Sequence, residues 1–293
     1  MNPKYTFERI TKADFDKLLA QYARVLPSKL QDLDHERLKV IPEQLQQRKK
    51  SKDGTYLEKD ELVTLVKWKL SHGTFRPRLL SLATANTAVP TISRTAFALV
   101  PSPLPSPLSP STLLPALKHL CILSGVGPAT ASLLLSSLCP DHVPFFSDEL
   151  FRWAMWDGPA GKDGRKGWDR GIGYTNKEYG GLVERVGELR ARLGVGAVAA
   201  EMVGYVLGKT GGEGLGEDDG GEEVKGDGEG GGKKKGLRKT ARPSREEVER
   251  MEAEEEEEEE EEEQKPKEKK IERIETDGKE GPQRRSKRVK LSK

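Results

Sequence analysis

The residues best suited to chemistry lie in one glycine-rich stretch. Residues 120–135 read LCILSGVGPATASLLL, with apolar residues on both sides of Gly125-Val126-Gly127. The spacing predicts two helices joined by a turn too tight for most side chains, because glycine adopts backbone angles closed to other residues. We expect Val126 to point inward. The amides around Gly125 and Gly127 should then lie exposed beside a helix N-terminus, where they can bind a phosphate oxygen.

This stretch resembles the helix-hairpin-helix motif of DNA-repair and replication proteins, and every position of that pattern is filled. The resemblance implies contact with the DNA backbone. The contacting residues would be Ser124, Gly125, Val126, Gly127, Ala129 and Thr130. The alternative is an ordinary helical hairpin with a glycine turn.

The resemblance extends to the endonuclease III-like DNA glycosylase superfamily, whose hairpin is followed by an Asp near the start of a later helix. Asp148, within PFFSDEL, stands at about that distance from Gly127. This implies a monofunctional glycosylase in which Asp148 stabilises positive charge on the sugar of a flipped nucleotide. The bifunctional members have a lysine where this chain has Ala129, so lyase chemistry is not expected. Alternatively, Asp148 caps its helix beside Ser147.

A second group of candidates mixes basic and aromatic residues. Lys67, Lys69, Arg76 and Arg78 surround Trp68, an arrangement that can follow a nucleic-acid backbone and stack on a base. The alternative places Trp68 in the core with solvated lysines around it. Residues 67–79 (KWKLSHGTFRPRL) and 144–150 (PFFSDEL) also resemble segments of a eukaryotic family of uncharacterised proteins. That resemblance implies kinship and no function.

The elements that position these residues are helical. Periodic apolar residues predict an all-α, multi-helix domain over residues 1–208, with no convincing strand pattern. A Pro-rich segment, 100–112, is interpreted as an insertion loop between two helices that pack together, rather than as a linker between domains. The predicted helices cover about 11–26, 58–70, 78–86, 112–122, 128–138, 147–156, 176–193 and 197–208, together with one that ends at Leu99.

The remaining residues, 209–293, have a different composition. They contain no aromatic residue and carry a net charge of −5, against +7 for residues 1–208. Such a segment buries too little apolar surface to offset its ordering entropy, so a long disordered, charged tail is expected. The acidic run 254–263 could bind basic proteins such as histones. The cluster 284–291 resembles a nuclear localisation signal and predicts a nuclear protein through Arg284, Arg285, Lys287, Arg288 and Lys290.

Composition narrows the function further. Two cysteines and four histidines without zinc spacing predict no metal site and no cofactor. No stretch of 18 apolar residues is present and the first residues are charged, so we expect a soluble intracellular protein without a membrane span. The leading hypothesis is a nuclear DNA-binding or DNA-repair-related protein. The alternatives are a monofunctional DNA glycosylase without the catalytic lysine and a non-catalytic scaffold for protein interactions.

Overall fold

The structure is a computed structural model that describes residues 1–73, 77–161 and 163–215. None of these residues lies in a strand, which confirms the all-α prediction. Arg76, the acidic run 254–263 and the basic cluster 284–291 lie outside the described residues. The helical elements are η1 (Pro3–Tyr5), α1 (Lys12–Leu19), α2 (Tyr22–Val25), η2 (Ser28–Leu30), α3 (Gln31–His35), the π-helical η3 (Glu36–Val40), α4 (Ile41–Lys49), α5 (Lys59–His72), α6 (Pro77–Ala85), α7 (Val89–Ala98), α8 (Pro110–Leu120), α9 (Pro128–Leu138), α10 (Asp148–Ala154), η4 (Gly167–Asp169), α11 (Asn176–Leu193) and α12 (Ala197–Lys209).

Local capping signals determine where several helices begin. The Thr11 side chain accepts a hydrogen bond from the amide of Asp14 at the start of α1, and Thr175 forms a capping box at the start of α11. One helical stretch was missed. Residues 31–49 are helical throughout. No helix was predicted there from the sequence, because the second half of this stretch is polar. Pro42 is tolerated there because it stands in the first turn of α4, and Leu45 is fully buried.

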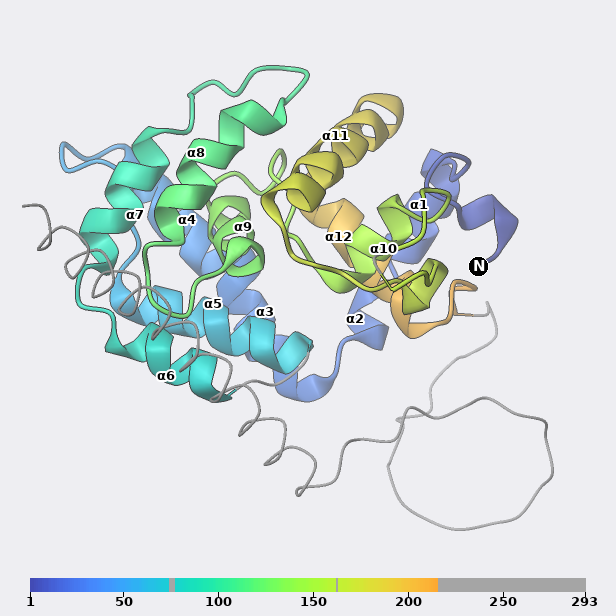
Figure 1. Ribbon diagram of the computed structural model, residues 1–293, viewed down its shortest axis with the longest axis horizontal. Coiled ribbons are helices and arrows are strands. Elements are labelled where there is room, and N and C mark those ends of the chain that lie inside the picture. Colours follow the sequence, from blue (N-terminus) through green and yellow to red (C-terminus); the bar gives the residue numbers. More distant parts are fainter. Residues whose placement is uncertain (74–76, 162, 216–293) are drawn as a thin grey trace, which may run out of the picture. The chain divides into compact units, whose positions relative to one another are not determined.

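The helices form two groups within the described unit (Figure 1). One group, at the left of the view, is the continuous stretch α3–α9, in which α5 contacts α3, α6, α7 and α9. The other group combines both ends of the described chain, because α12 contacts α1, α2 and α10. α7 and α8 pack against each other, so the Pro-rich segment is a loop between two neighbouring helices.

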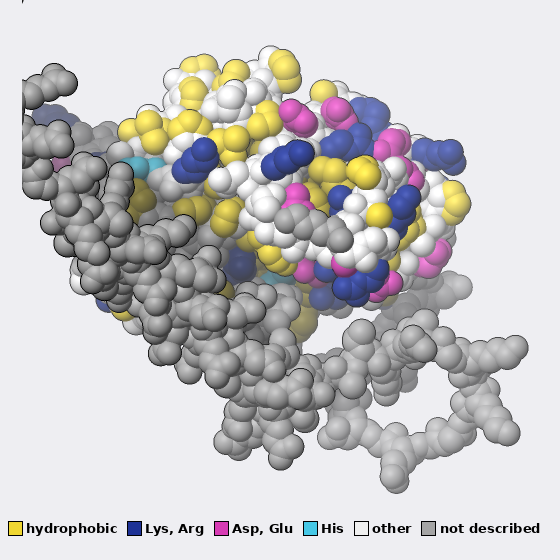
Figure 2. Space-filling view, viewed as in Figure 1, with side chains coloured by type: hydrophobic (Ala, Val, Ile, Leu, Met, Phe, Trp, Pro, Cys, Tyr) yellow, Lys and Arg dark blue, Asp and Glu magenta, His cyan; other side chains and the backbone are white. Residues whose placement is uncertain are grey.

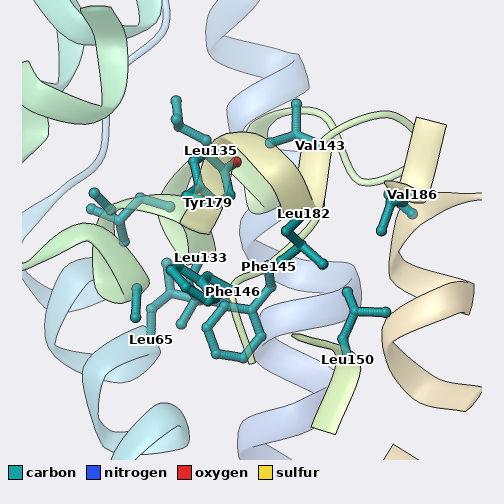
Figure 3. Close-up of a cluster of buried hydrophobic side chains, with 14 of the residues drawn as sticks. Leu65, Leu133, Leu135, Val143, Phe145, Phe146, Leu150, Tyr179, Leu182 and Val186 are labelled. Atoms are coloured by element: carbon teal, nitrogen blue, oxygen red, sulfur yellow. The ribbon is translucent and has the colours of Figure 1, made fainter. Parts of the chain in front are cut away.

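An apolar core connects α9 with the segment that leads into α10. Phe145 and Phe146 lie among side chains of α9 and α11 in Figure 3, and both are almost completely buried. The Ser132 hydroxyl on α9 accepts a hydrogen bond from the amide of Phe146 at 2.9 Å. This bond holds the segment before α10 against α9, while α10 itself packs against α11 and α12.

The two groups of helices also meet at a buried charged cluster. Arg37 of η3 donates from Nη2 to Oε2 of Glu201 on α12 at 2.9 Å, and both side chains are almost fully buried. Asp34 accepts hydrogen bonds from the Tyr22 hydroxyl at 2.9 Å and from Nε1 of Trp68 at 3.0 Å. The Arg37 guanidinium lies over the Trp68 ring, 3.8 Å from its centroid. Trp68 is therefore a core residue, which is the second of the two interpretations made from the sequence.

His72 extends this cluster. Its ring lies between Trp68, 4.5 Å away by centroids, and Tyr205, 4.2 Å away. Burial lowers the pKa of His72 well below its ordinary value, and the positive charges of Arg37 and Lys209 lower it further. His72 is therefore a neutral ring in the folded protein at neutral pH.

The ordered chain continues past the end of α12. The sequence placed the end of the folded part at residue 208, whereas residues as far as Leu215 still contact the N-terminal segment. The amide of Asn2 donates to the carbonyl of Gly212 at 3.0 Å. Gln21 accepts from the amide of Leu215 at 2.7 Å and donates to its carbonyl at 3.3 Å. Both backbone polar groups of Leu215 are therefore hydrogen-bonded to the Gln21 side chain.

We expect a chain that ends at Gly208 to be less stable than one that ends at Leu215. The shorter chain loses the hydrogen bonds to Asn2 and Gln21, a net loss of about 1–2 kcal/mol. For a domain of this size that loss lowers the melting temperature by roughly 2–8 °C. Thermal unfolding of the two truncations measures the difference, and equal melting temperatures would contradict it.

His72 predicts a loss of stability in acid. The unfolded chain binds a proton at this residue below pH about 6.5, whereas the folded chain does not, so stability falls as the pH drops through that value. The slope is at most about 1.4 kcal/mol per pH unit. His72→Phe keeps a flat ring between Trp68 and Tyr205 and removes the titration. Its melting temperature should fall less between pH 7 and pH 5 than that of the wild type, whereas His35→Gln, at an exposed histidine, should behave as the wild type does.

Candidate nucleic-acid interface

The turn between α8 and α9 is built from residues 121–127. Val126 is 4 % exposed, and its amide donates to the carbonyl of Leu123 at 3.1 Å. Ala131 on α9 is fully buried, and α8 and α9 pack against each other. The prediction that Val126 points inward is confirmed. Ser124 and Gly127 lie exposed on either side of it.

The two glycines of the turn have different roles. Gly125 has a φ of +73°, in the region that favours glycine. A Cβ there would also lie 2.9 Å from the carbonyl oxygen of Leu79 and 3.2 Å from the amide nitrogen of Ala83. Gly125 is therefore required both by its backbone angle and by its contact with the backbone of α6.

Gly127 does not meet the expectation that both glycines adopt unusual backbone angles. Its φ is −89° and its ψ is −178°, an extended conformation open to any residue. A Cβ at Gly127 would meet no atom within 4 Å. The missing side chain instead leaves open space in front of the first turn of α9.

Asn86, a residue that the sequence analysis did not identify, holds the turn. Its Nδ2 donates to the carbonyl of Ser124 at 3.0 Å and its Oδ1 accepts from the amide of Ser124 at 2.9 Å. Nδ2 also lies 3.1 Å from the carbonyls of Leu82 and Ala83 at the end of α6. This pairing between distant residues has no local sequence signal other than an asparagine just after a helix.

The turn leaves several backbone donors available. The carbonyl of Gly127 accepts the amide of Ala131 at 2.9 Å, which begins the hydrogen-bond ladder of α9. The amides of Ala129 and Thr130 stand in the first turn, where a helix offers no internal acceptor. Both residues as a whole are nearly buried, at 7 % and 4 % exposed, so their side chains contribute packing rather than contacts. The positive end of the helix dipole adds to the attraction for an anion at this point.

The basic residues of α5 and α6 are placed unequally. Arg78 is exposed and adjoins Leu79, whose carbonyl faces Gly125. Lys67 is exposed and Lys69 is half-buried on α5. Trp68 is fully buried between these lysines and cannot stack on a base. On the face seen in Figure 2, basic side chains are interspersed with acidic ones over the right-hand group of helices.

Asp148 is the first residue of α10, directly after the capping residue Ser147. Its Oδ1 accepts a hydrogen bond from the Tyr174 hydroxyl at 2.5 Å, and its Oδ2 lies 3.4 Å from Nη1 of Arg152. Both oxygens are thus engaged, while the side chain is 37 % exposed. Tyr174 has a φ of +48°, which is unusual for a residue other than glycine. This geometry suits a structural carboxylate in the first turn of a helix.

Two hollows in the described part of the chain lie away from Asp148. A groove of about 470 Å³ runs along α4, and a chamber of about 40 Å³ adjoins Arg37; neither includes Asp148. Among the described residues, no cluster of His, Cys, Asp or Glu could hold a metal ion. No single described helix is long and apolar enough to cross a membrane, although the bent pair α11–α12, which meet at 101°, has that length and composition together.

Comparison with protein-family models, with curated proteins and with solved structures finds no match to this chain.

The difference between the two glycines predicts that substitution by alanine lowers the stability at Gly125 but hardly changes it at Gly127. Gly125→Ala forces a side chain into a positive φ and against the backbone of α6, which should cost about 1–3 kcal/mol. Gly127→Ala adds a methyl group to open space at an ordinary φ, so stability should change by less than about 0.5 kcal/mol. Chemical denaturation of both variants tests this difference, which equal losses at the two positions would contradict.

Proposed function

We propose that this protein binds DNA in the nucleus through the 121–127 turn and the first turn of α9, which act as a helix-hairpin-helix. The ligand is the phosphate backbone, and binding is largely independent of sequence. Backbone amides contact phosphate oxygens and carry no information about the base. The basic cluster 284–291 supplies the nuclear signal in this proposal.

The open position at Gly127 is the observation that carries the proposal. It leaves room for a phosphate group in front of the amides of Gly127, Ala129 and Thr130. The turn is held in place before any ligand arrives, because Asn86 bonds to Ser124 and Gly125 presses against α6. A preorganised site loses less conformational entropy on binding than a mobile loop does.

Charge supports the same ligand. Residues 1–208 carry a net charge of +7, which attracts a polyanion at long range. Arg78 is exposed and directly precedes Leu79, whose carbonyl faces Gly125. The other basic candidates, Lys67 and Lys69, contribute to binding only if the same DNA duplex extends along α5.

The enzymatic alternative, a monofunctional glycosylase, has less support. Asp148 would need to leave Tyr174 or Arg152 to face a sugar, and its surroundings include no identified base pocket. Ala129 offers no amine for a Schiff base. The scaffold alternative, in which the same helices bind a protein, is separated from DNA binding by the experiment below.

A DNA-binding titration at several salt concentrations tests the proposal. If about 3–5 phosphates are neutralised, log K against log salt should have a slope of about −3 to −4.5. Gly127→Val fills the open space and should weaken binding to every DNA sequence by about 10- to 100-fold, the loss of one or two charge-assisted hydrogen bonds. Gly187→Val is the control, because Gly187 on α11 also has open space at its Cβ position.

The control should bind DNA as the wild type does. A folded Gly127→Val variant with wild-type affinity would reject the turn as the DNA site. If the wild type also binds no DNA at low salt, the scaffold alternative becomes the leading function.

A further inference from the structure

Two buried polar atoms at the junction of the helix groups face each other without a partner. Oε1 of Glu201 and Nε2 of His72 are 3.8 Å apart, and neither makes a hydrogen bond. Glu201 is completely buried and His72 is 7 % exposed. Buried polar atoms in native proteins are nearly always paired, so an unpaired acceptor beside an unpaired ring nitrogen requires an explanation.

The charges around Glu201 do not balance when every carboxylate is ionised. Asp34 on α3 and Glu201 then oppose the single charge of Arg37 on η3, because His72 on α5 is neutral. Glu149 on α10 faces the cluster but pairs with Lys209, the next cation on α12, at 3.2 Å. Tyr22 on α2 and Tyr205 on α12 are neutral phenols. One uncompensated negative charge therefore remains in the interior, where it is costly.

We propose that the junction holds one proton between Glu201 and His72, with Glu201 as a neutral acid that donates from Oε1 to Nε2 of His72. A small shift of either side chain closes the 3.8 Å gap to hydrogen-bond length. The added proton brings the buried cluster to zero net charge and satisfies both unpaired atoms. When the pH rises and the proton leaves to solvent, a buried carboxylate remains, and the contact between the two helix groups weakens.

The proton resides on the carboxyl group rather than on the ring. Burial raises the pKa of Glu201, although Arg37 partly opposes this effect. Burial lowers the pKa of His72, and so do the nearby charges of Arg37 and Lys209. Asp34 already accepts hydrogen bonds from Tyr22 and Trp68 and needs no proton to satisfy it.

This arrangement has a definite effect of pH on stability. Glu201 has a raised pKa in the folded chain, so above its unfolded pKa the folded chain holds a proton that the unfolded chain has lost. Stability is then lost as the pH rises towards the folded pKa. Between pH 7 and pH 8.5, where His72 is neutral in both states, this loss should lower the melting temperature by at most on the order of 3–5 °C per pH unit.

The experiment compares the melting temperatures of the full chain and two variants across this range. Glu201→Gln mimics the neutral acid, since its amide donates to His72 and its carbonyl accepts from Arg37. Because it binds no proton on folding, its melting temperature should lie above that of the wild type at pH 7 and should not show the alkaline decline. Glu149→Gln, which changes a glutamate beside the cluster, should retain the decline. An unchanged decline in Glu201→Gln would overturn the proposal.

Infrared spectroscopy of the wild type gives a second measurement that does not depend on a variant folding. A carbonyl-stretch band of a protonated carboxyl group should persist in the native protein at pH 7 and disappear when the protein unfolds. Its absence in the native protein would overturn the proposal. Neither measurement involves DNA, so its outcome is independent of the proposed function.

Discussion

The buried hydrogen bond from the Arg37 guanidinium to Glu201 is the constraint on which the arrangement of the helices depends. It joins η3 of the continuous helix group to α12 of the group formed by both chain ends, in a place that water does not reach. Such a pair is satisfied in one geometry, because moving either helix leaves a buried charge without its partner. Breaking a buried pair in this way typically costs about 3–5 kcal/mol, a large part of the stability of an ordinary domain. The rings of Trp68 and Tyr205 exclude solvent around it.

The candidate interface is likewise a product of tertiary contacts and not of a short motif alone. The glycine turn has its conformation because Gly125 fits against α6 and because Asn86 bonds to both backbone groups of Ser124. Ser132 then transmits the position of α9 to the segment before α10. The carboxylate of Asp148 is held separately, by Tyr174 and Arg152. The turn and this carboxylate occupy defined positions before any ligand binds.

Features that depend on neighbours in the chain were predictable from the sequence. α9 has the predicted bounds 128–138, and Thr11 and Ser147 cap their helices as expected, because apolar periodicity and capping residues act within one or two turns. Features that depend on distant residues were not. The pairing of Arg37 with Glu201 joins residues 164 positions apart. The helix over residues 42–49 was missed because most of its residues are polar and few of them are buried. The assignment of Gly127 to a special backbone angle was wrong, because its φ of −89° is open to any residue.

The order of the chain has a consequence for synthesis. α1 and α2 precede α3–α9 in the chain, yet their principal partner is α12, close to the end of the described chain. At translation rates of 5–20 residues per second, the apolar side chains of Phe15, Leu18 and Tyr22 wait on the order of 10–40 s before α12 covers them. The continuous stretch α3–α9 can fold during this interval. During this interval the nascent chain therefore exposes the apolar side chains of α1 and α2 beside helices that can already be folded. Aggregation through these side chains is then most favoured, and a chaperone that binds them would have its largest effect.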